Sequence, residues 1–164
     1  MDRIYNILFL CTGNSARSIL AEAIVNREAD GRFRAWSAGS FPKGEVHPRA
    51  LALLTELGFA TDGMRSKSWD EFASPGAPRF DFIFTVCDQA AGETCPIWPG
   101  KPIQAHWGIE DPAAASQDMQ STAFLTAFAY LKRRIDLFRA LPLEALDDMA
   151  IKREADAIGR TIDR

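Results

Sequence analysis

A run of chemically capable residues lies near the start of the chain, in the sequence Cys11-Thr12-Gly13-Asn14-Ser15-Ala16-Arg17-Ser18. A cysteine thiolate is a strong nucleophile, and an arginine guanidinium is a planar fork that can hold two oxygens of a tetrahedral oxyanion. The successive backbone N–H groups of a tight turn around Gly13 offer a further anion site. This segment therefore predicts an oxyanion-binding loop in which Cys11 is the nucleophile and Arg17 holds the anion.

The same groups are expected to control the ionisation of Cys11. Backbone N–H groups and a helix start favour the thiolate, and the hydroxyls of Ser15 and Ser18 can donate hydrogen bonds toward the sulfur. We expect the pKa of Cys11 to lie well below the ~8.5 of a free cysteine. Asn14 is expected to brace the loop backbone. The competing interpretation is a small buried cysteine at the end of a strand.

A second candidate is Asp111, which is followed by Pro112. Proline keeps the preceding residue out of the helical region, which fixes the backbone that aims the carboxyl group. Transfer of an oxyanion to sulfur needs a proton for the departing oxygen, and an aspartic acid can supply it. Asp-Pro is also a common turn and helix-entry pair. The residues alone leave these two interpretations equally open.

Two further cysteines lie at the end of the third expected strand and beyond it. Cys87 ends that strand, and Cys95 lies eight residues further on. Together with Cys11 they can form a relay of a nucleophile, a resolving thiol and a thiol that carries the disulfide to the surface. In a regular helix eight residues separate two Cα atoms by about 12 Å, whereas a disulfide needs ~7 Å or less. The segment 88–100 must therefore unwind on oxidation, and its glycines and prolines indicate a mobile element.

Strands and helices alternate along the chain, which predicts a parallel sheet with helices on both faces. The strands are expected at 4–11, 33–38, 80–87 and 102–107, the last at a sheet edge where Pro102 is tolerated. Helices are expected from Ile19, at 48–57 and at 121–140, and helical periodicity returns at Ile151, Ala155, Ile158 and Ile162. Because parallel strands end at one edge, Cys11 and Cys87 should meet there.

The length, net charge and cysteine and histidine content of the chain exclude several classes of function. The 164 residues fit one domain, and a net charge of −3 gives no electrostatic footprint for nucleic acid. We expect a cytoplasmic protein without a membrane span, in which three cysteines are reactive or buried rather than structural disulfides. His47 and His106 are not at ligand spacing with cysteine, so no metal site is expected. The loop lacks both a Gly-Lys-Ser/Thr and a three-glycine nucleotide fingerprint.

The pattern Cys-x-Gly-Asn-x-x-Arg-Ser resembles the low-molecular-weight protein tyrosine phosphatase fold, and Ser15-Ala16 ahead of Arg17 is similar to the arsenate reductases that share it. The resemblance covers about residues 4 to 140. It implies a single three-layer α/β domain around a four-stranded parallel sheet at 1–140, with a C-terminal helical extension at 141–164. It also implies that Asp111 is the general acid.

The resemblance to the thioredoxin-coupled arsenate reductases implies that Cys87 and Cys95 carry out a disulfide relay and that thioredoxin reduces the product. Glutaredoxin or a small thiol are other candidate reductants, and no tightly bound cofactor is implied. The gap between these cysteines is one residue longer than in compact members of the family. Some compact members bind potassium near the loop. Asn14 and Glu22 match ligands of that site, whereas Ser66 and Ser68 match it only in part, because no aspartate stands at position 68.

We therefore expect reduction of arsenate to arsenite, with phosphate as a competing anion. One alternative is a phosphatase that hydrolyses phosphate monoesters with Cys11, Arg17 and Asp111 and leaves the other cysteines idle. The phosphatases carry an aromatic residue after the Asp-Pro pair, whereas three alanines follow it here, which disfavours phosphotyrosine. A second alternative is a non-catalytic module that senses an oxyanion.

Overall fold

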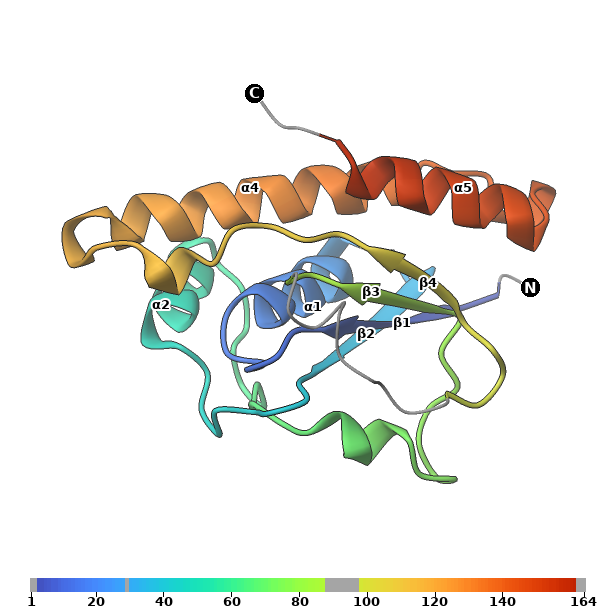
Figure 1. The fold of residues 1–164 in the computed structure, drawn as a ribbon. Coiled ribbons are helices and arrows are strands. Elements are labelled where there is room, and N and C mark those ends of the chain that lie inside the picture. Colours follow the sequence, from blue (N-terminus) through green and yellow to red (C-terminus); the bar gives the residue numbers. More distant parts are fainter. Residues whose placement is uncertain (1–2, 29, 88–97, 162–164) are drawn as a thin grey trace.

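The protein is built around a four-stranded parallel sheet in the order β2-β1-β3-β4 (Figure 1). The computed structural model describes residues 3–28, 30–87 and 98–161. The strands are β1 (Tyr5–Leu10), β2 (Phe33–Ala38), β3 (Phe82–Thr85) and β4 (Ile103–His106). The expected four-stranded parallel sheet is confirmed, and β4 lies at its edge as predicted.

The α-helices are α1 (Arg17–Glu28), α2 (Pro48–Glu56), α4 (Gln120–Arg139) and α5 (Asp148–Gly159). Short 3-10 helices lie between them: η1 (Trp69–Phe72), η2 (Pro112–Ala114), η3 (Gln117–Met119) and η4 (Leu143–Ala145). Local chemistry sets the ends of α2. The ring of His47 accepts from the N–H of Arg49, Pro48 takes the first turn, and Gly58 follows the end of the helix with a φ of 83°.

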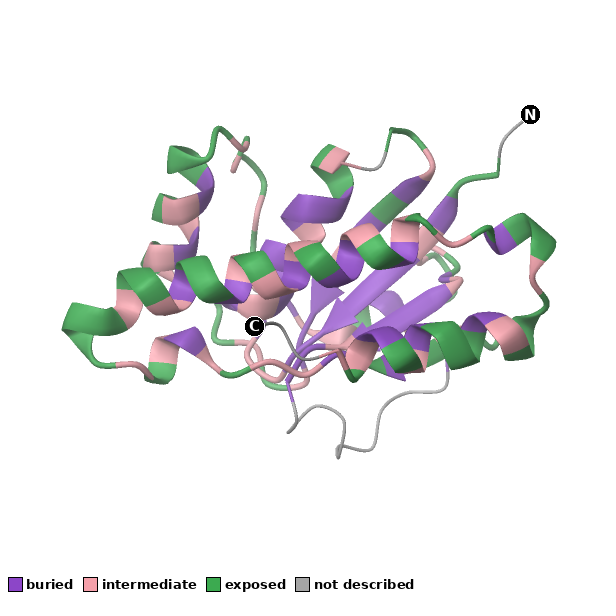
Figure 2. Cartoon of the chain, turned by 90° about the horizontal axis from the view of Figure 1, so that it is seen from above, coloured by how far each residue is buried: buried purple, intermediate pink, exposed green. Residues whose placement is uncertain are grey.

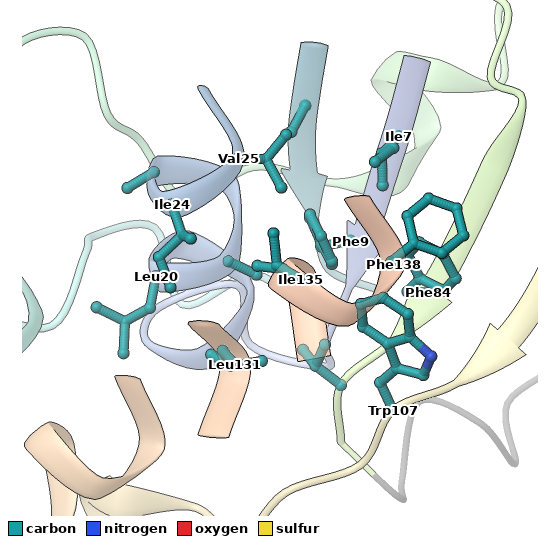
Figure 3. Close-up of a cluster of buried hydrophobic side chains, with 14 of the residues drawn as sticks. Ile7, Phe9, Leu20, Ile24, Val25, Phe84, Trp107, Leu131, Ile135 and Phe138 are labelled. Atoms are coloured by element: carbon teal, nitrogen blue, oxygen red, sulfur yellow. The ribbon is translucent and has the colours of Figure 1, made fainter. Parts of the chain in front are cut away.

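β1 is buried on both faces, so its alternate residues enter two different cores. Ile7 and Phe9 join a cluster formed with α1, α4 and α5. Figure 3 shows the part of this core that lies between β1, α1 and α4. Leu8 and Leu10 join a second cluster with Phe72 and other aromatic residues from η1 and its neighbouring segments. A continuous apolar run is what a strand covered on both faces requires.

The two faces of the sheet are covered differently. Among the described residues, α1, α4 and α5 pack on one face, whereas the 3-10 helix η1 and the segments around it cover the other. Helices therefore flank the sheet as predicted, and within residues 3–28, 30–87 and 98–161 the helix on the second face is the 3-10 helix η1. Large aromatic side chains, among them Phe80 and Trp98, pack against one another on the second face.

α4 lies where a helix was predicted at 121–140, and one side of it faces the core. Phe124, Leu131, Ile135 and Phe138 are buried, and the opposite side of the helix faces solvent (Figure 2). The helical periodicity after residue 141 produces α5, whose Ile151, Ala155 and Ile158 are buried against the body of the protein. In the part of the chain that the structure describes, no helix has the length and apolar character needed to cross a bilayer.

Candidate active site

The predicted loop joins β1 to α1 and has its carbonyl groups turned away from the candidate anion site. We call residues Cys11–Ser18 the anion loop. The backbone N–H groups of Phe41, Lys43 and His47 donate to the carbonyls of Thr12, Gly13 and Ser15, at 3.0, 3.0 and 2.8 Å. In a trans peptide the N–H points opposite to the C=O of the preceding residue. The N–H groups of residues 13, 14 and 16 therefore point away from residues 41–47. The arrangement suits an oxyanion.

Asn14 braces the anion loop, as the sequence predicted. The residue is fully buried and has a φ of 43°, a conformation that a non-glycine residue adopts at a cost. Its amide nitrogen donates to Ser18 Oγ at 2.8 Å, and its Oδ1 accepts the Lys67 N–H at 2.9 Å. These two buried bonds offset the backbone strain and hold the loop in one shape.

Gly39, which the sequence reasoning missed, permits this loop shape. It follows β2, and a Cβ built on it would lie 2.4 Å from the carbonyl oxygen of Thr12 and 2.7 Å from that of Cys11. No other residue fits without moving the loop. The sequence feature that could have identified Gly39 is its place directly after the strand that pairs with β1. A glycine at such a point often marks a close approach of two backbone segments.

The two described cysteines meet at the carboxyl edge of the sheet, as predicted. Cys11 and Cys87 are both buried, and the Cys87 side chain is a hydrogen-bond partner of the Cys11 thiol. The N–H of Thr12 donates to Cys87 Sγ at 3.3 Å, and its hydroxyl lies 3.6 Å from the same sulfur. Cys87 follows β3, which pairs with β1 in parallel. Cys95 and most of the expected mobile segment lie outside the described residues.

The pKa of the Cys11 thiol is raised above its ordinary value, so the predicted lowering is wrong. The hydrogen bond with Cys87 is the largest cause and burial the second. The Arg17 charge and the Gly13 N–H lower the pKa, but to a smaller extent. Two neighbouring buried thiols release their protons as a coupled pair, because a charge on one opposes a charge on the other. The anion loop could be identified from the sequence, whereas the burial of Cys11 and its hydrogen bond with Cys87 could not.

Arg17 occupies the position expected of an anion-binding residue. Its Nη1 donates to the carbonyl of Ile109 at 2.9 Å, and its Nη2 lies 3.8 Å from Asp111 Oδ2. Its Nε is buried and has no hydrogen-bond partner among the described residues. A buried N–H without a partner is costly, so a bound oxyanion would satisfy a group that the protein alone leaves unpaired.

The position of Asp111 is compatible with both interpretations of the Asp-Pro pair. Its Oδ1 accepts the N–H of Ala113 at 3.0 Å and caps η2, while Oδ2 faces Arg17. The carboxyl group is 42% exposed and lines a cavity of about 200 Å³ together with residues 11–17 of the anion loop. One oxygen can thus hold the backbone while the other meets a ligand. We call residues 106–112, which carry this carboxyl group, the acid segment.

Two further residues line this cavity that the sequence reasoning did not select. Phe41 is 72% exposed and Lys43 packs its side chain against Gly13. Both residues belong to the segment whose backbone N–H groups bind the carbonyls of the anion loop. That backbone contact places their side chains beside the cavity. Phe41 gives the rim the exposed aromatic ring that the residues after Pro112 do not provide.

A buried lysine lies behind the anion loop, where the potassium site of the resembling reductases was considered. The Lys67 ammonium lies 3.7 Å from Glu22 Oε1 and donates to the carbonyl of Arg65 at 3.0 Å. The Ser37 hydroxyl also donates to that Glu22 oxygen, and burial lowers the pKa of Lys67. Because a fixed ammonium already faces Glu22 and Asn14 Oδ1 already accepts from the Lys67 backbone, these residues do not fit a potassium ion.

Comparison with known proteins gives a consistent result. The family model for low molecular weight phosphotyrosine protein phosphatase matches residues 6–148. An arsenate reductase of Halalkalibacterium halodurans is 36% identical over 109 residues, which are 66% of this chain and 75% of that protein. A solved structure described as an arsenate reductase in the phosphate binding state is 27% identical, with a TM-score of 0.68, and covers 83% of this chain and 97% of that one.

A second similar structure is a thioredoxin-dependent arsenate reductase from Corynebacterium glutamicum. It is 24% identical, with a TM-score of 0.58, and the match covers 81% of this chain and 61% of that one. At this level of identity the likeness concerns the fold. The anion loop, the acid segment and the neighbouring thiol thus lie on a framework that these proteins share.

Proposed function

The chain belongs to the low molecular weight phosphotyrosine protein phosphatase family, and we propose that within it the protein reduces arsenate to arsenite. The observation that carries this proposal is the second buried thiol, Cys87, hydrogen-bonded to the nucleophile Cys11. Hydrolysis of a phosphate ester needs a nucleophile, an arginine and an acid. Reduction needs in addition a second thiol beside the first, because two sulfurs supply the two electrons.

In the first step, arsenate binds in the anion loop, with its oxygens held by Arg17 and by the backbone N–H groups. The deprotonated fraction of Cys11 attacks arsenic, and one As–O bond breaks. Asp111 gives its proton to the departing hydroxyl group, which leaves as water. Donors fixed in place before the reaction stabilise the charge on the arsenic oxygens without having to reorganise.

In the second step, Cys87 attacks the sulfur of Cys11. A disulfide forms, the S–As bond breaks, and its electron pair remains on arsenic, which leaves as arsenite. The attack requires a negative charge on Cys87 Sγ. The N–H and hydroxyl of Thr12 lie beside this sulfur and stabilise that charge.

In the third step, Cys95 attacks Cys87, which frees Cys11 and leaves a Cys87–Cys95 disulfide for an external thiol to reduce. This role of Cys95 rests on its position in the sequence. Thioredoxin is the proposed reductant, and the fold shared with a thioredoxin-dependent arsenate reductase supports it. Glutaredoxin or a small thiol would deliver the same two electrons. No tightly bound cofactor is needed, since every electron passes through sulfur.

The test follows NADPH consumption with arsenate, thioredoxin and thioredoxin reductase, for the unmodified protein and for Cys87→Ser and Cys95→Ser. We expect turnover by the unmodified protein and none by either variant. Replacing thioredoxin by glutaredoxin with glutathione identifies the reductant. A phosphatase would instead hydrolyse an aryl phosphate and tolerate both substitutions, and an oxyanion sensor would bind arsenate without turnover. Either result would overturn the proposal.

A further inference from the structure

α5 begins at Asp148, where the match to the family model ends, and lies against β4 and α4 (Figure 1). Its apolar face is buried, and its Lys152 ammonium donates to the carbonyl of Gln104 in β4. The helix therefore covers the outer edge of the sheet. It also comes close to the residues that follow β4, which are the first residues of the acid segment.

The contact between α5 and the acid segment is unusually close. The indole N–H of Trp107 donates to the carbonyl of Ala155 at 2.9 Å, and the ring stacks on Phe84 with centroids 3.8 Å apart. At the end of the helix, a Cβ built on Gly159 would lie 2.1 Å from the carbonyl oxygen of His106 and 2.8 Å from the Trp107 ring. Only glycine allows this approach. The reason is steric, because Gly159 does not have a positive φ.

Arg134 of α4 joins α5 to the same segment. The residue is 6% exposed, and its Nη1 donates to the carbonyls of Trp107 and Gly108 at 2.8 and 3.0 Å. Its Nη2 donates to the carbonyl of Thr161, just after α5, at 3.3 Å. A buried guanidinium requires such acceptors, so these groups are held together.

The next carbonyl along the chain, that of Ile109, accepts from Arg17. Three consecutive carbonyls of the acid segment are thus held by two arginines, one from the anion loop and one from α4. The backbone on the other side is fixed by β3, since the N–H groups of Trp107 and Ile109 donate to Thr85 and Val86 at 2.7 and 3.2 Å. Asp111 lies two residues beyond the last of these contacts.

We propose that α5 and Arg134 form a clamp that positions Asp111 over the nucleophile. The inference rests on the proposed function, because it assumes that Asp111 protonates the departing oxygen. Arg134 and Gly159 are positioning residues that act through the backbone of residues 106–109. The contacts of α5 and Arg134 do not include the anion loop, which reaches this backbone through the bond from Arg17 to the Ile109 carbonyl. Binding of the oxyanion and its delivery to Cys11 should therefore depend little on the clamp.

The test uses Gly159→Ala, which places a methyl group against His106, with Gly76→Ala as a matched control. Gly76 also lacks a positive φ, and a Cβ there meets no atom within 4 Å. We expect Gly159→Ala to lower kcat for arsenate reduction by about tenfold, part of the ~10²–10⁴ that a general acid contributes. The KM for arsenate and the inhibition constant for phosphate should stay within about twofold. Gly76→Ala should match the unmodified protein.

A double-mutant cycle with Asp111→Asn separates the clamp from a general structural role. With the acid removed, Gly159→Ala should cause no further loss, because the two changes affect the same step. An equal loss in both backgrounds, a raised KM or an unchanged kcat in Gly159→Ala would each overturn the clamp. Trp107→Phe, which removes the indole N–H and retains a ring for stacking, repeats the cycle if Gly159→Ala fails to fold.

The cycle also distinguishes failure of the clamp from failure of the proposed function. If Asp111→Asn alone retains the full rate, the acid role itself is wrong. If Asp111→Asn is slow and Gly159→Ala is normal, the acid role stands and the clamp is wrong. If the unmodified protein shows no arsenate-dependent turnover, the proposed function fails before either substitution is made.

Discussion

The two halves of the active site are held in place in different ways. The anion loop is one continuous segment whose carbonyls are bound by residues 41–47, and Asn14 braces it from within. The acid segment carries a single functional side chain, and its backbone is held from β3, α4 and α5. A binding loop can therefore be recognised as a local motif, whereas a correctly aimed acid depends on distant parts of the chain.

Arg17 belongs to both halves, so its replacement should have the largest effect. Arg17→Lys keeps the charge but loses the fork and the bond to the Ile109 carbonyl. We expect kcat/KM for arsenate to fall by about 10³-fold, because a donor to the developing charge and the link to the acid segment are both lost. Steady-state turnover and phosphate titration by calorimetry measure the two effects. Arg65→Lys, in an exposed pair with Glu71, is the control and should be unchanged.

Gly39→Ala tests how rigidly the anion loop is fixed. The added Cβ would lie 2.4 Å from the Thr12 carbonyl oxygen. We expect the free energy of unfolding to fall by about 2 kcal/mol and phosphate to bind about tenfold or more weakly as the loop shifts. Urea unfolding and phosphate titration give these values. Unaltered phosphate affinity would show that the loop adjusts without loss, and the two halves would then differ less than the contacts indicate.

Cys87→Ala removes the largest cause of the raised pKa of Cys11. A raised thiol pKa means less thiolate at a given pH, and removing its cause increases the thiolate fraction. In a Cys95→Ala background, we expect Cys11 to react with iodoacetamide near neutral pH about tenfold faster once Cys87 is replaced. Mass spectrometry of the labelled cysteine measures this rate. An equal or slower rate would show that the loop, and not Cys87, governs the thiol.

Lys67→Met should have the smallest effect on binding, because Lys67 supports the anion loop from behind. Its loss leaves Glu22, which is 21% exposed, without its cation. We expect the free energy of unfolding to fall by about 1–3 kcal/mol and phosphate affinity to fall a few-fold. The double variant Lys67→Met with Glu22→Gln should recover most of the stability. The unmodified protein should reduce arsenate equally well in sodium and potassium chloride, and a potassium requirement would contradict the assignment of Lys67.

The order of strands and helices, the anion loop and the Asp-Pro pair could be identified from the sequence, because each depends on residues close together in the chain. Periodicity located α4 within one residue at each end and predicted α5. The parallel sheet in turn predicted that Cys11 and Cys87 would meet. These inferences depend on hydrophobic patterning and backbone chemistry, which local sequence records.

Only the tertiary structure decided how these parts act on each other. The pKa of Cys11 depends on burial and on Cys87, 76 positions away, and the sign of its shift differs from the one that the loop alone suggested. The approach of Lys67 to Glu22, of Gly39 to the loop and of Gly159 to the acid segment likewise depends on packing between separate elements. Desolvation and steric contact act through space, so no motif in the chain records them.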